Sequence, residues 1–172
     1  LTQRHGRPGD LIRLRNGVGR LYSEQGQFGK AIGSYRHADM LSGQLGESRR
    51  PSIIGNIGSV FQSWAMYDSA RVYYDHALGL HRDAGDSSGV ATTLNNIGSL
   101  LGEEGRHREA VVYHLRALPL SQGVMRARIF NNLAVESLEL DDFERVNEYL
   151  IEAWTLYGDL GNQIGLATVS NN

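Results

Sequence analysis

Cysteine is absent from this 172-residue chain, so disulfide bonds and thiolate metal sites are excluded. The chain has only three prolines, which leaves room for long helices. Long apolar runs are also missing: no stretch approaches the ~18 residues of a membrane span, and no signal-peptide pattern occurs. The lack of cysteine fits a reducing compartment, and we therefore expect a cytoplasmic protein that does not contact a membrane.

Charge is unevenly distributed, although the formal net charge is only −2. Residues 1–50 carry nine Lys/Arg and four Asp/Glu, whereas residues 131–172 carry one Arg and eight acids. Either charge drifts along a solvated surface, or the chain is electrostatically polar and steers a partner or associates head to tail with another copy. Because the chain has no net basic character, we expect no nucleic acid partner.

Four copies of one pattern follow each other along the chain. Their anchor residues are Gly19, Gly58, Gly98 and Ala134, at spacings of 39, 40 and 36 residues. An aliphatic residue precedes every anchor, a small or turn-forming residue follows seven positions later, and alanine occurs nineteen positions later in all four copies. Agreement at so many fixed offsets indicates an internal repeat.

Each copy is predicted to form two helices. Its apolar positions recur at intervals of three, four, seven and eight residues, which is the periodicity of one helical face. The residue seven after the anchor interrupts this periodicity and predicts a tight turn. Small residues at the anchor and at offsets twelve and nineteen would let the helices approach to about 8–10 Å. One pair cannot bury its apolar faces alone, so the predicted fold is all-α, a superhelix of stacked antiparallel pairs.

The pattern resembles the tetratricopeptide repeat. The usual period of that family is 34 residues, and the longer period here resembles the repeats of kinesin light chains, of Pins-type modulators and of bacterial signalling proteins. The resemblance implies a right-handed α-α superhelix that serves as a protein-binding scaffold. In the third copy the pattern is carried by Leu94, Ile97, Gly98, Leu101, Gly105, Ala110, His114 and Ala117.

The repeat also sets the expected domain organisation, which is a single array over residues 1–172. Residues 1–11 match the tail of a preceding repeat, and residues 167–172 match the start of a fifth one, so we expect a segment of a longer protein. The four complete repeats are predicted to cover residues 12–50, 51–90, 91–126 and 127–166.

Asparagine recurs just before the anchors, although it is a poor helix former. These positions resemble those that face the concave groove of tetratricopeptide arrays, where a column of amides would bind the backbone of an extended peptide. Alternatively, the amides bond to each other or to neighbouring backbone and hold adjacent repeats in register. The predicted peptide-binding residues are Asn16, Arg20, Asn56, Ser59, Asn95, Asn96, Ser99, Asn131 and Asn132.

Further positions on the same helical face predict a groove that is basic at its start and acidic at its end. Arg13 and Arg20 would bind a carboxylate or a phosphate there, or lie in solvent. The other positions predicted to face inward are Ser23, Glu24, Ser52, Gln62, Thr92, Glu103, Arg128 and Glu139.

Histidine provides no convincing metal or catalytic pattern. His107 and His114 occupy positions that are aromatic in sister repeats, which indicates packing residues. His37 and His76 share one repeat position but lack the carboxylate or cysteine pattern of a metal site. The segment at 26–31, GQFGKA, departs from phosphate-loop spacing, and no nucleophile–base–acid constellation occurs. We expect no enzyme activity, no catalytic residue, no metal and no cofactor.

These observations predict a non-catalytic scaffold that binds a peptide or protein segment in its concave groove. The alternative is a regulatory or sensor segment of a larger signalling enzyme or transcription regulator, acting through intramolecular contacts. A third hypothesis resembles the peptide-regulated phosphatases of sporulating bacteria, whose catalytic glutamine lies on a separate helical bundle that this sequence lacks.

Overall fold

A computed structural model of the chain describes residues 8–46 and 48–171. Within these residues the regular secondary structure is helical and no strand occurs, which confirms the predicted all-α fold. None of the helices in the described part of the chain is long and apolar enough to span a membrane. The chain divides into two compact units, residues 1–80 and 81–172, which are described separately below.

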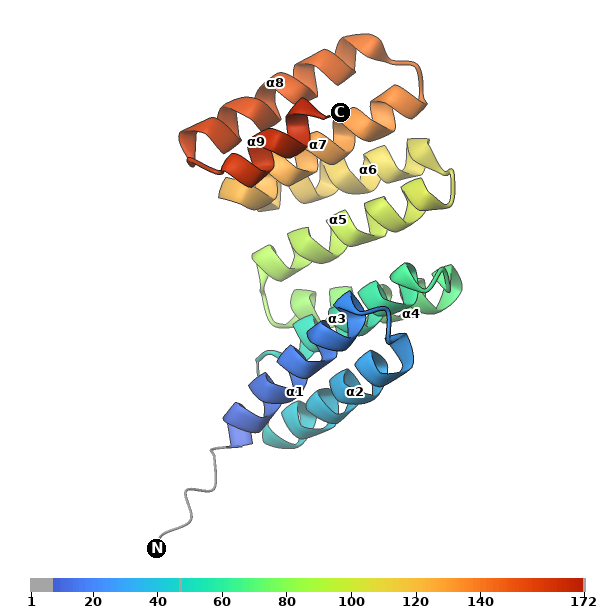
Figure 1. The fold of residues 1–172 in the computed structure, drawn as a ribbon, viewed down its shortest axis with the longest axis vertical. Coiled ribbons are helices and arrows are strands. Elements are labelled where there is room, and N and C mark those ends of the chain that lie inside the picture. Colours follow the sequence, from blue (N-terminus) through green and yellow to red (C-terminus); the bar gives the residue numbers. More distant parts are fainter. Residues whose placement is uncertain (1–7, 47, 172) are drawn as a thin grey trace, which may run out of the picture. The chain divides into compact units, whose positions relative to one another are not determined.

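The first unit contains two antiparallel helix pairs. Helix α1 lies alongside α2, and α3 packs on α2 (Figure 1). The hydroxyl of Tyr74 on α4 donates to Gln62 on α3 at 2.7 Å, which ties the second pair together. The helices of this unit are α1 (Pro8–Glu24), α2 (Phe28–Leu45), α3 (Arg50–Ser63) and α4 (Tyr67–Asp83), the last three residues of which fall in the second unit.

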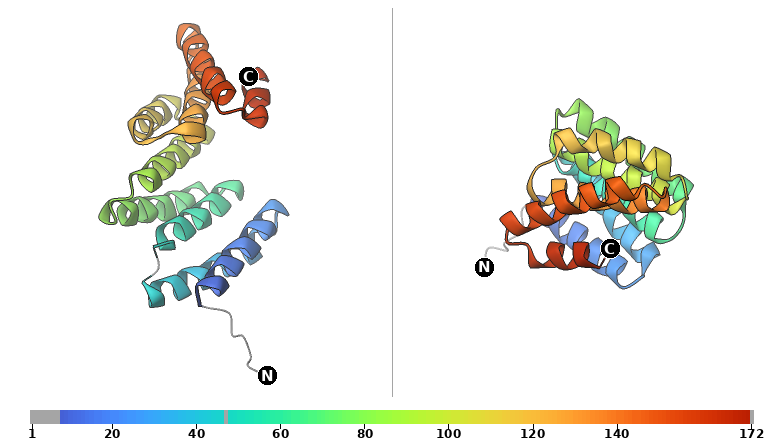
Figure 2. Two further views of the ribbon diagram at one scale, coloured as in Figure 1. Left: turned by 90° about the vertical axis from the view of Figure 1, so that its left-hand side faces the viewer. Right: turned by 90° about the horizontal axis from the view of Figure 1, so that it is seen from above.

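The second unit repeats this arrangement. Helix α5 pairs with α6 and α7 pairs with α8, while α6 packs on α7 and α8 packs on α9 (Figure 2). The third repeat is shorter because α6 gives way to a 3₁₀ helix, η1, that contains Pro119. The helices of this unit are α5 (Ser87–Glu103), α6 (His107–Ala117), η1 (Leu118–Leu120), α7 (Gly123–Glu139), α8 (Phe143–Asp159) and α9 (Gln163–Ser170).

A residue with positive φ forms the tight turn inside each pair. The φ angle is 69° at Gly26, 55° at Ala65, 75° at Gly105 and 58° at Asp141. These are the residues seven positions after the anchors, so the predicted turn is confirmed at all four places. Glycine adopts this conformation freely, whereas alanine and aspartate do so at a cost.

The anchor glycines are points of close helix contact, as predicted. A Cβ atom added at Gly58 would lie 2.7 Å from the ring of Tyr74, and one added at Gly98 would lie 2.6 Å from the ring of His114. Such distances are shorter than van der Waals contact, so a side chain at either anchor would push the paired helices apart. The alanines nineteen positions after the anchors are fully buried in the same interfaces: Ala38, Ala77, Ala117 and Ala153.

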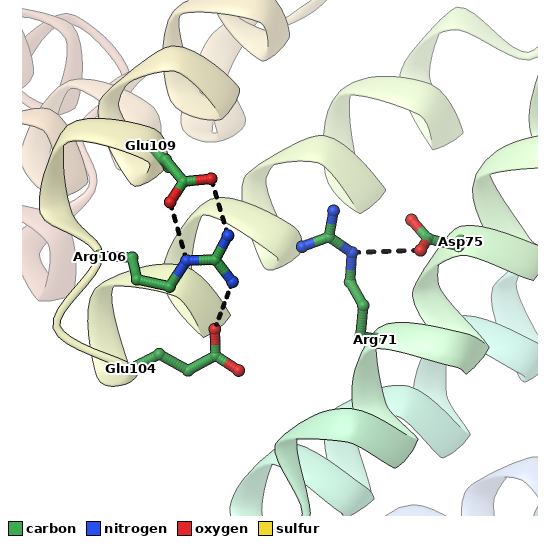
Figure 3. Close-up of polar contacts among 5 residues, drawn as sticks. All are labelled: Arg71, Asp75, Glu104, Arg106 and Glu109. Carbon is green, nitrogen blue, oxygen red and sulfur yellow. Dashed lines mark hydrogen bonds and ion pairs between the residues drawn. The ribbon is translucent and has the colours of Figure 1, made fainter.

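An exposed ion-pair cluster spans the turn between α5 and α6. The guanidinium of Arg106 donates to both carboxylate oxygens of Glu109, at 2.8 and 2.7 Å, and to Glu104 at 3.1 Å (Figure 3). In the first unit, Arg71 on α4 makes a single bond to Asp75, one turn later, at 3.1 Å. Exposed pairs of this kind contribute little to stability because water and salt screen them.

The helices begin earlier than the predicted repeat boundaries. Helices α1, α5 and α7 each start four residues before the predicted repeat starts at 12, 91 and 127, and α9 starts at Gln163 instead of 167. Residues 8–11, which the prediction gave to the tail of a preceding repeat, lie in the first turn of α1. The rest of that predicted tail, residues 1–7, lies outside the described residues.

Candidate functional site

Asparagine side chains link the first helices of neighbouring pairs within each unit. In the first unit, Nδ2 of Asn56 on α3 donates to Oδ1 of Asn16 on α1 at 3.0 Å. In the second unit, Nδ2 of Asn132 on α7 donates to Oδ1 of Asn95 on α5, also at 3.0 Å. Each bond joins the position two before one anchor to the position three before the previous anchor. The amides thus bond to each other across adjacent repeats, as in the second of the two alternatives drawn from the sequence.

The Asn95 amide also contacts the histidine of its own helix pair. Nδ1 of His114 lies 3.1 Å from Oδ1 of Asn95, and both side chains are buried. Because Oδ1 can only accept, the Nδ1 atom of His114 carries the proton. Burial lowers the pKa of His114 to about 4, so the ring is neutral near pH 7. This confirms His114 as a packing residue.

Two of the predicted groove residues are buried. Asn95 is 3% exposed and Asn131 is 8% exposed, so the prediction that they face a groove is wrong for this structure. The physical reason is helix geometry: consecutive residues are 100° apart, and when Asn132 faces outward its neighbour turns towards the paired helix. Asn96, the outward member of the other asparagine pair, is half-buried.

Two adjoining cavities lie between α1 and α3 in the first unit. The larger, of about 440 Å³, and the smaller, of about 240 Å³, share Asn16, Arg20 and Asn56. Four of the predicted peptide-binding residues line these cavities, the fourth being Ser59. The larger cavity is lined by Ile12, Arg13, Asn16, Gly17, Arg20, Arg49, Ser52, Ile53 and Asn56.

A cavity of about 310 Å³ lies beside α5 and α7 in the second unit. It contains two more of the predicted peptide-binding residues, Ser99 and Asn132, whose side chains approach to 3.4 Å. The remaining lining residues are Gly102, Glu103, His107, Val135, Glu136 and Glu139.

A hydrogen bond between Glu136 and His107 forms one wall of this cavity. Oε2 of Glu136 lies 2.8 Å from Nδ1 of His107, and only 8% of the Glu136 side chain is exposed. Burial raises the pKa of the Glu136 carboxyl, and the hydrogen bond from His107 opposes that rise. Gly102 provides the space, because a Cβ atom there would overlap the Glu136 carboxylate.

Sequence reasoning missed Glu136 and treated His107 only as a packing residue. The signal that would have found the pair is Gly102, which interrupts the apolar pattern on α5 where α7 places a carboxylate. Arg13 and Arg20 line the larger cavity of the first unit, and Glu103 and Glu139 line the cavity of the second. Among the described residues, no group of three His, Cys, Asp or Glu side chains is placed to hold a metal ion.

Comparison with known families confirms the resemblance drawn from the sequence. Residues 50–123 match the model of the tetratricopeptide repeat family. No protein among the curated sequences matches the chain significantly.

Solved structures of similar fold extend the likeness to nearly the whole chain. BtubC from P. vanneervenii is 22% identical with a TM-score of 0.75, covering 94% of this chain and 68% of that protein. Aspartyl phosphate phosphatase F from Bacillus subtilis is 14% identical with a TM-score of 0.84, covering 96% of this chain and 45% of that protein. The Rap conjugation gene regulator of plasmid pLS20, solved in complex with the Phr* peptide, is 13% identical with a TM-score of 0.88, covering 97% and 47%.

These identities establish the fold alone. The chain spans less than half the length of the last two proteins.

Proposed function

We propose that the chain is a non-catalytic interaction module that binds an extended peptide or protein segment on its first-helix face. In the first unit this face is formed by α1 and α3, and the second unit has a corresponding face of its own, formed by α5 and α7. One observation carries the proposal: of the seven predicted peptide-binding residues that are not buried, all but Asn96 line cavities on this face. They are Asn16, Arg20, Asn56 and Ser59 in the first unit, and Ser99 and Asn132 in the second.

The asparagine cross-links suit this role. An amide offers two donors and an acceptor, and the bond to Asn16 uses one donor of Asn56. That bond fixes the orientation in which Asn56 presents the rest of its amide to the adjoining cavity. A side chain that is already ordered loses less entropy when a ligand binds, so a cross-linked amide is a better peptide contact than a freely rotating one.

The cavity of the second unit supports a binding role more than a catalytic one, although it contains a serine, a histidine and a glutamate. Nδ1 of His107 is bonded to Glu136, whereas Oγ of Ser99 accepts from Asn132. A nucleophile must be hydrogen-bonded to its base, and these contacts place Ser99 in the asparagine network instead. The peptide bound by the Rap regulator of similar fold also supports a peptide ligand for this chain.

The proposal is tested by selecting random 12-residue displayed peptides on the folded chain and mapping the selected peptide by amide chemical shifts. We expect the largest shift changes in the first helices, near Asn16 and Asn56 or near Ser99 and Asn132. A selection that enriches no peptide, or shifts that cluster on the second helices α2, α4, α6 and α8, would contradict it.

A further inference from the structure

The larger cavity between α1 and α3 is lined by three arginines and by no acidic residue. We propose that this cavity binds an anionic side chain of the bound segment, either the carboxylate of Asp or Glu or the phosphate of a phosphorylated residue. The inference rests on the proposed function and names the chemistry that the first unit recognises.

The three arginines reach the cavity from two helices. Arg13 and Arg20 are seven residues apart on α1 and therefore lie on one helical face, while Arg49 directly precedes α3. A guanidinium group presents donors in a planar fork that matches the oxygens of a carboxylate or a phosphate. Three such groups around about 440 Å³ give a strongly positive site with room for one acidic side chain and its backbone.

The acidic residues next to Arg13 and Arg20 are weak competitors. Arg13 is bonded to Asp10, three residues earlier on the same exposed face. Arg20 lies 3.7 Å from an oxygen of Glu24, which is beyond normal hydrogen-bond distance, and its side chain is 71% exposed. Exposed ion pairs within one helix contribute little to stability. A ligand anion can therefore replace these carboxylates at a small cost in free energy.

Neutral groups complete the site. Asn16 and Asn56, held by their mutual hydrogen bond, and the hydroxyl of Ser52 lie among the arginines. Ile12 and Ile53 form an apolar wall and are almost fully buried.

The cavity of the second unit has the opposite charge and serves as an internal control. Its lining includes Glu103, Glu136 and Glu139 and no lysine or arginine. An anion that binds the first unit through its arginines should therefore leave the second cavity unoccupied.

The first test titrates the full chain with N-acetylglutamic acid amide and with N-acetyl-O-phosphoserine amide, using sodium chloride at equal ionic strength as the control. We expect saturable shifts of the arginine Nε–H signals and of the Ser52 and Asn56 amides, which are lost in the double variant Arg13→Gln, Arg20→Gln. The tighter of the two probes identifies the anion. Shifts equal to those with chloride, or shifts that persist in the double variant, overturn the inference.

A matched control separates recognition from folding. Arg71→Gln removes an arginine of the same unit that also pairs with an acid one turn later, but Arg71 lines neither cavity (Figure 3). Its anion shifts should equal those of the unchanged chain. A loss as large as that of the double variant would show a general effect of charge and overturn the inference.

The second test measures the affinity of a selected peptide. We expect the selection to enrich Asp or Glu, and Arg20→Gln to weaken binding about tenfold, as for the loss of one charge-assisted contact, with no change in Arg71→Gln. Peptides that bind the first-helix face without acidic residues and without dependence on Arg20 overturn this inference and leave the proposed function standing. If no peptide is selected, the proposed function fails, and the anion titration alone decides the inference.

A second copy of the chain is the competing occupant, because residues 131–172 are strongly acidic. Sedimentation at about 0.02 M and about 0.5 M salt distinguishes a second copy from a peptide as the occupant. Salt screens exposed charges and therefore separates copies that are held together by them. We expect a monomer at both concentrations. A low-salt dimer that Arg20→Gln abolishes would assign the cavity to self-association and overturn the peptide assignment.

Discussion

Oδ1 of Asn95 lies 3.1 Å from Nδ1 of His114, buried between α5 and α6. The same oxygen accepts a second hydrogen bond, from Asn132 on α7. One buried amide therefore joins both helices of its own pair to the first helix of the next pair. In the first unit Asn16 makes the corresponding bond with Asn56, and Tyr35 takes the place of the histidine against the anchor Gly19.

Replacing Asn95 with alanine should destabilise the chain by about 3 kcal/mol, because the buried Nδ1–H of His114 and a donor of Asn132 lose their acceptor. Urea denaturation at pH 7 measures this loss. Asn96→Ala is the matched control on the same helix, and since Asn96 is half-buried we expect a change below about 1 kcal/mol. Equal losses for the two variants would contradict the cross-link.

The pKa of His114 predicts a loss of stability in acid. The unfolded histidine binds a proton near its ordinary pKa of 6.5, whereas burial lowers the pKa of the folded residue to about 4. Between these values the unfolded state binds more protons, so stability falls as the pH drops from about 6.5 to about 4. The contribution of His114 is about 3 kcal/mol and is complete above pH 6.5.

His114→Phe provides the control for this pH dependence, because sister repeats carry an aromatic ring at the same position. The variant keeps the ring but cannot titrate. We expect the unchanged chain to lose unfolding free energy relative to the variant as the pH is lowered from 7 to 4, because only the unchanged chain carries the histidine. A difference that stays constant over this range would show that His114 does not titrate as stated.

The turns inside the first two helix pairs make a reciprocal test. Ala65→Gly should stabilise the chain by up to about 1 kcal/mol, because φ is positive at Ala65 and only glycine adopts that conformation without strain. Gly26→Ala, at the same repeat position, should destabilise the chain by about 1 kcal/mol. A Cβ atom there has no neighbour within contact distance, so the cost comes only from the positive φ angle of the backbone. Thermal unfolding measures both changes, and shifts of the same sign would contradict the assignment.

Much of this fold could be predicted because small residues recur at the same positions of each repeat. The anchor glycines, the buried alanines and the turn residues are small for reasons that act within one helix pair, and such constraints recur at fixed offsets. The starts of the helices could not be predicted so well. Their first turns, such as Ser87–Val90 of α5, lie outside the apolar periodicity that marks the repeat.

The candidate site was only partly predictable. Asn131 and Asn132 have the same side chain, so the sequence does not distinguish them. The orientation of α7 about its own axis decides that Asn132 lines a cavity while Asn131 is buried. The pair of His107 and Glu136 depends on how α7 packs beside the turn between α5 and α6, which local sequence does not encode.

The central claim, that the first-helix face binds an extended segment, is tested most directly by comparing two equal substitutions in the second unit. Val135 lines the cavity beside α5 and α7 and is 38% exposed, while Val112 is 54% exposed on the second helix α6. Fluorescence anisotropy with a selected peptide gives the affinity of each tyrosine variant. For a peptide whose amide shifts map near Ser99 and Asn132, we expect that Val135→Tyr fills the cavity and weakens binding at least about tenfold, whereas Val112→Tyr has no effect. Equal affinities for the two variants, both still folded, would contradict it.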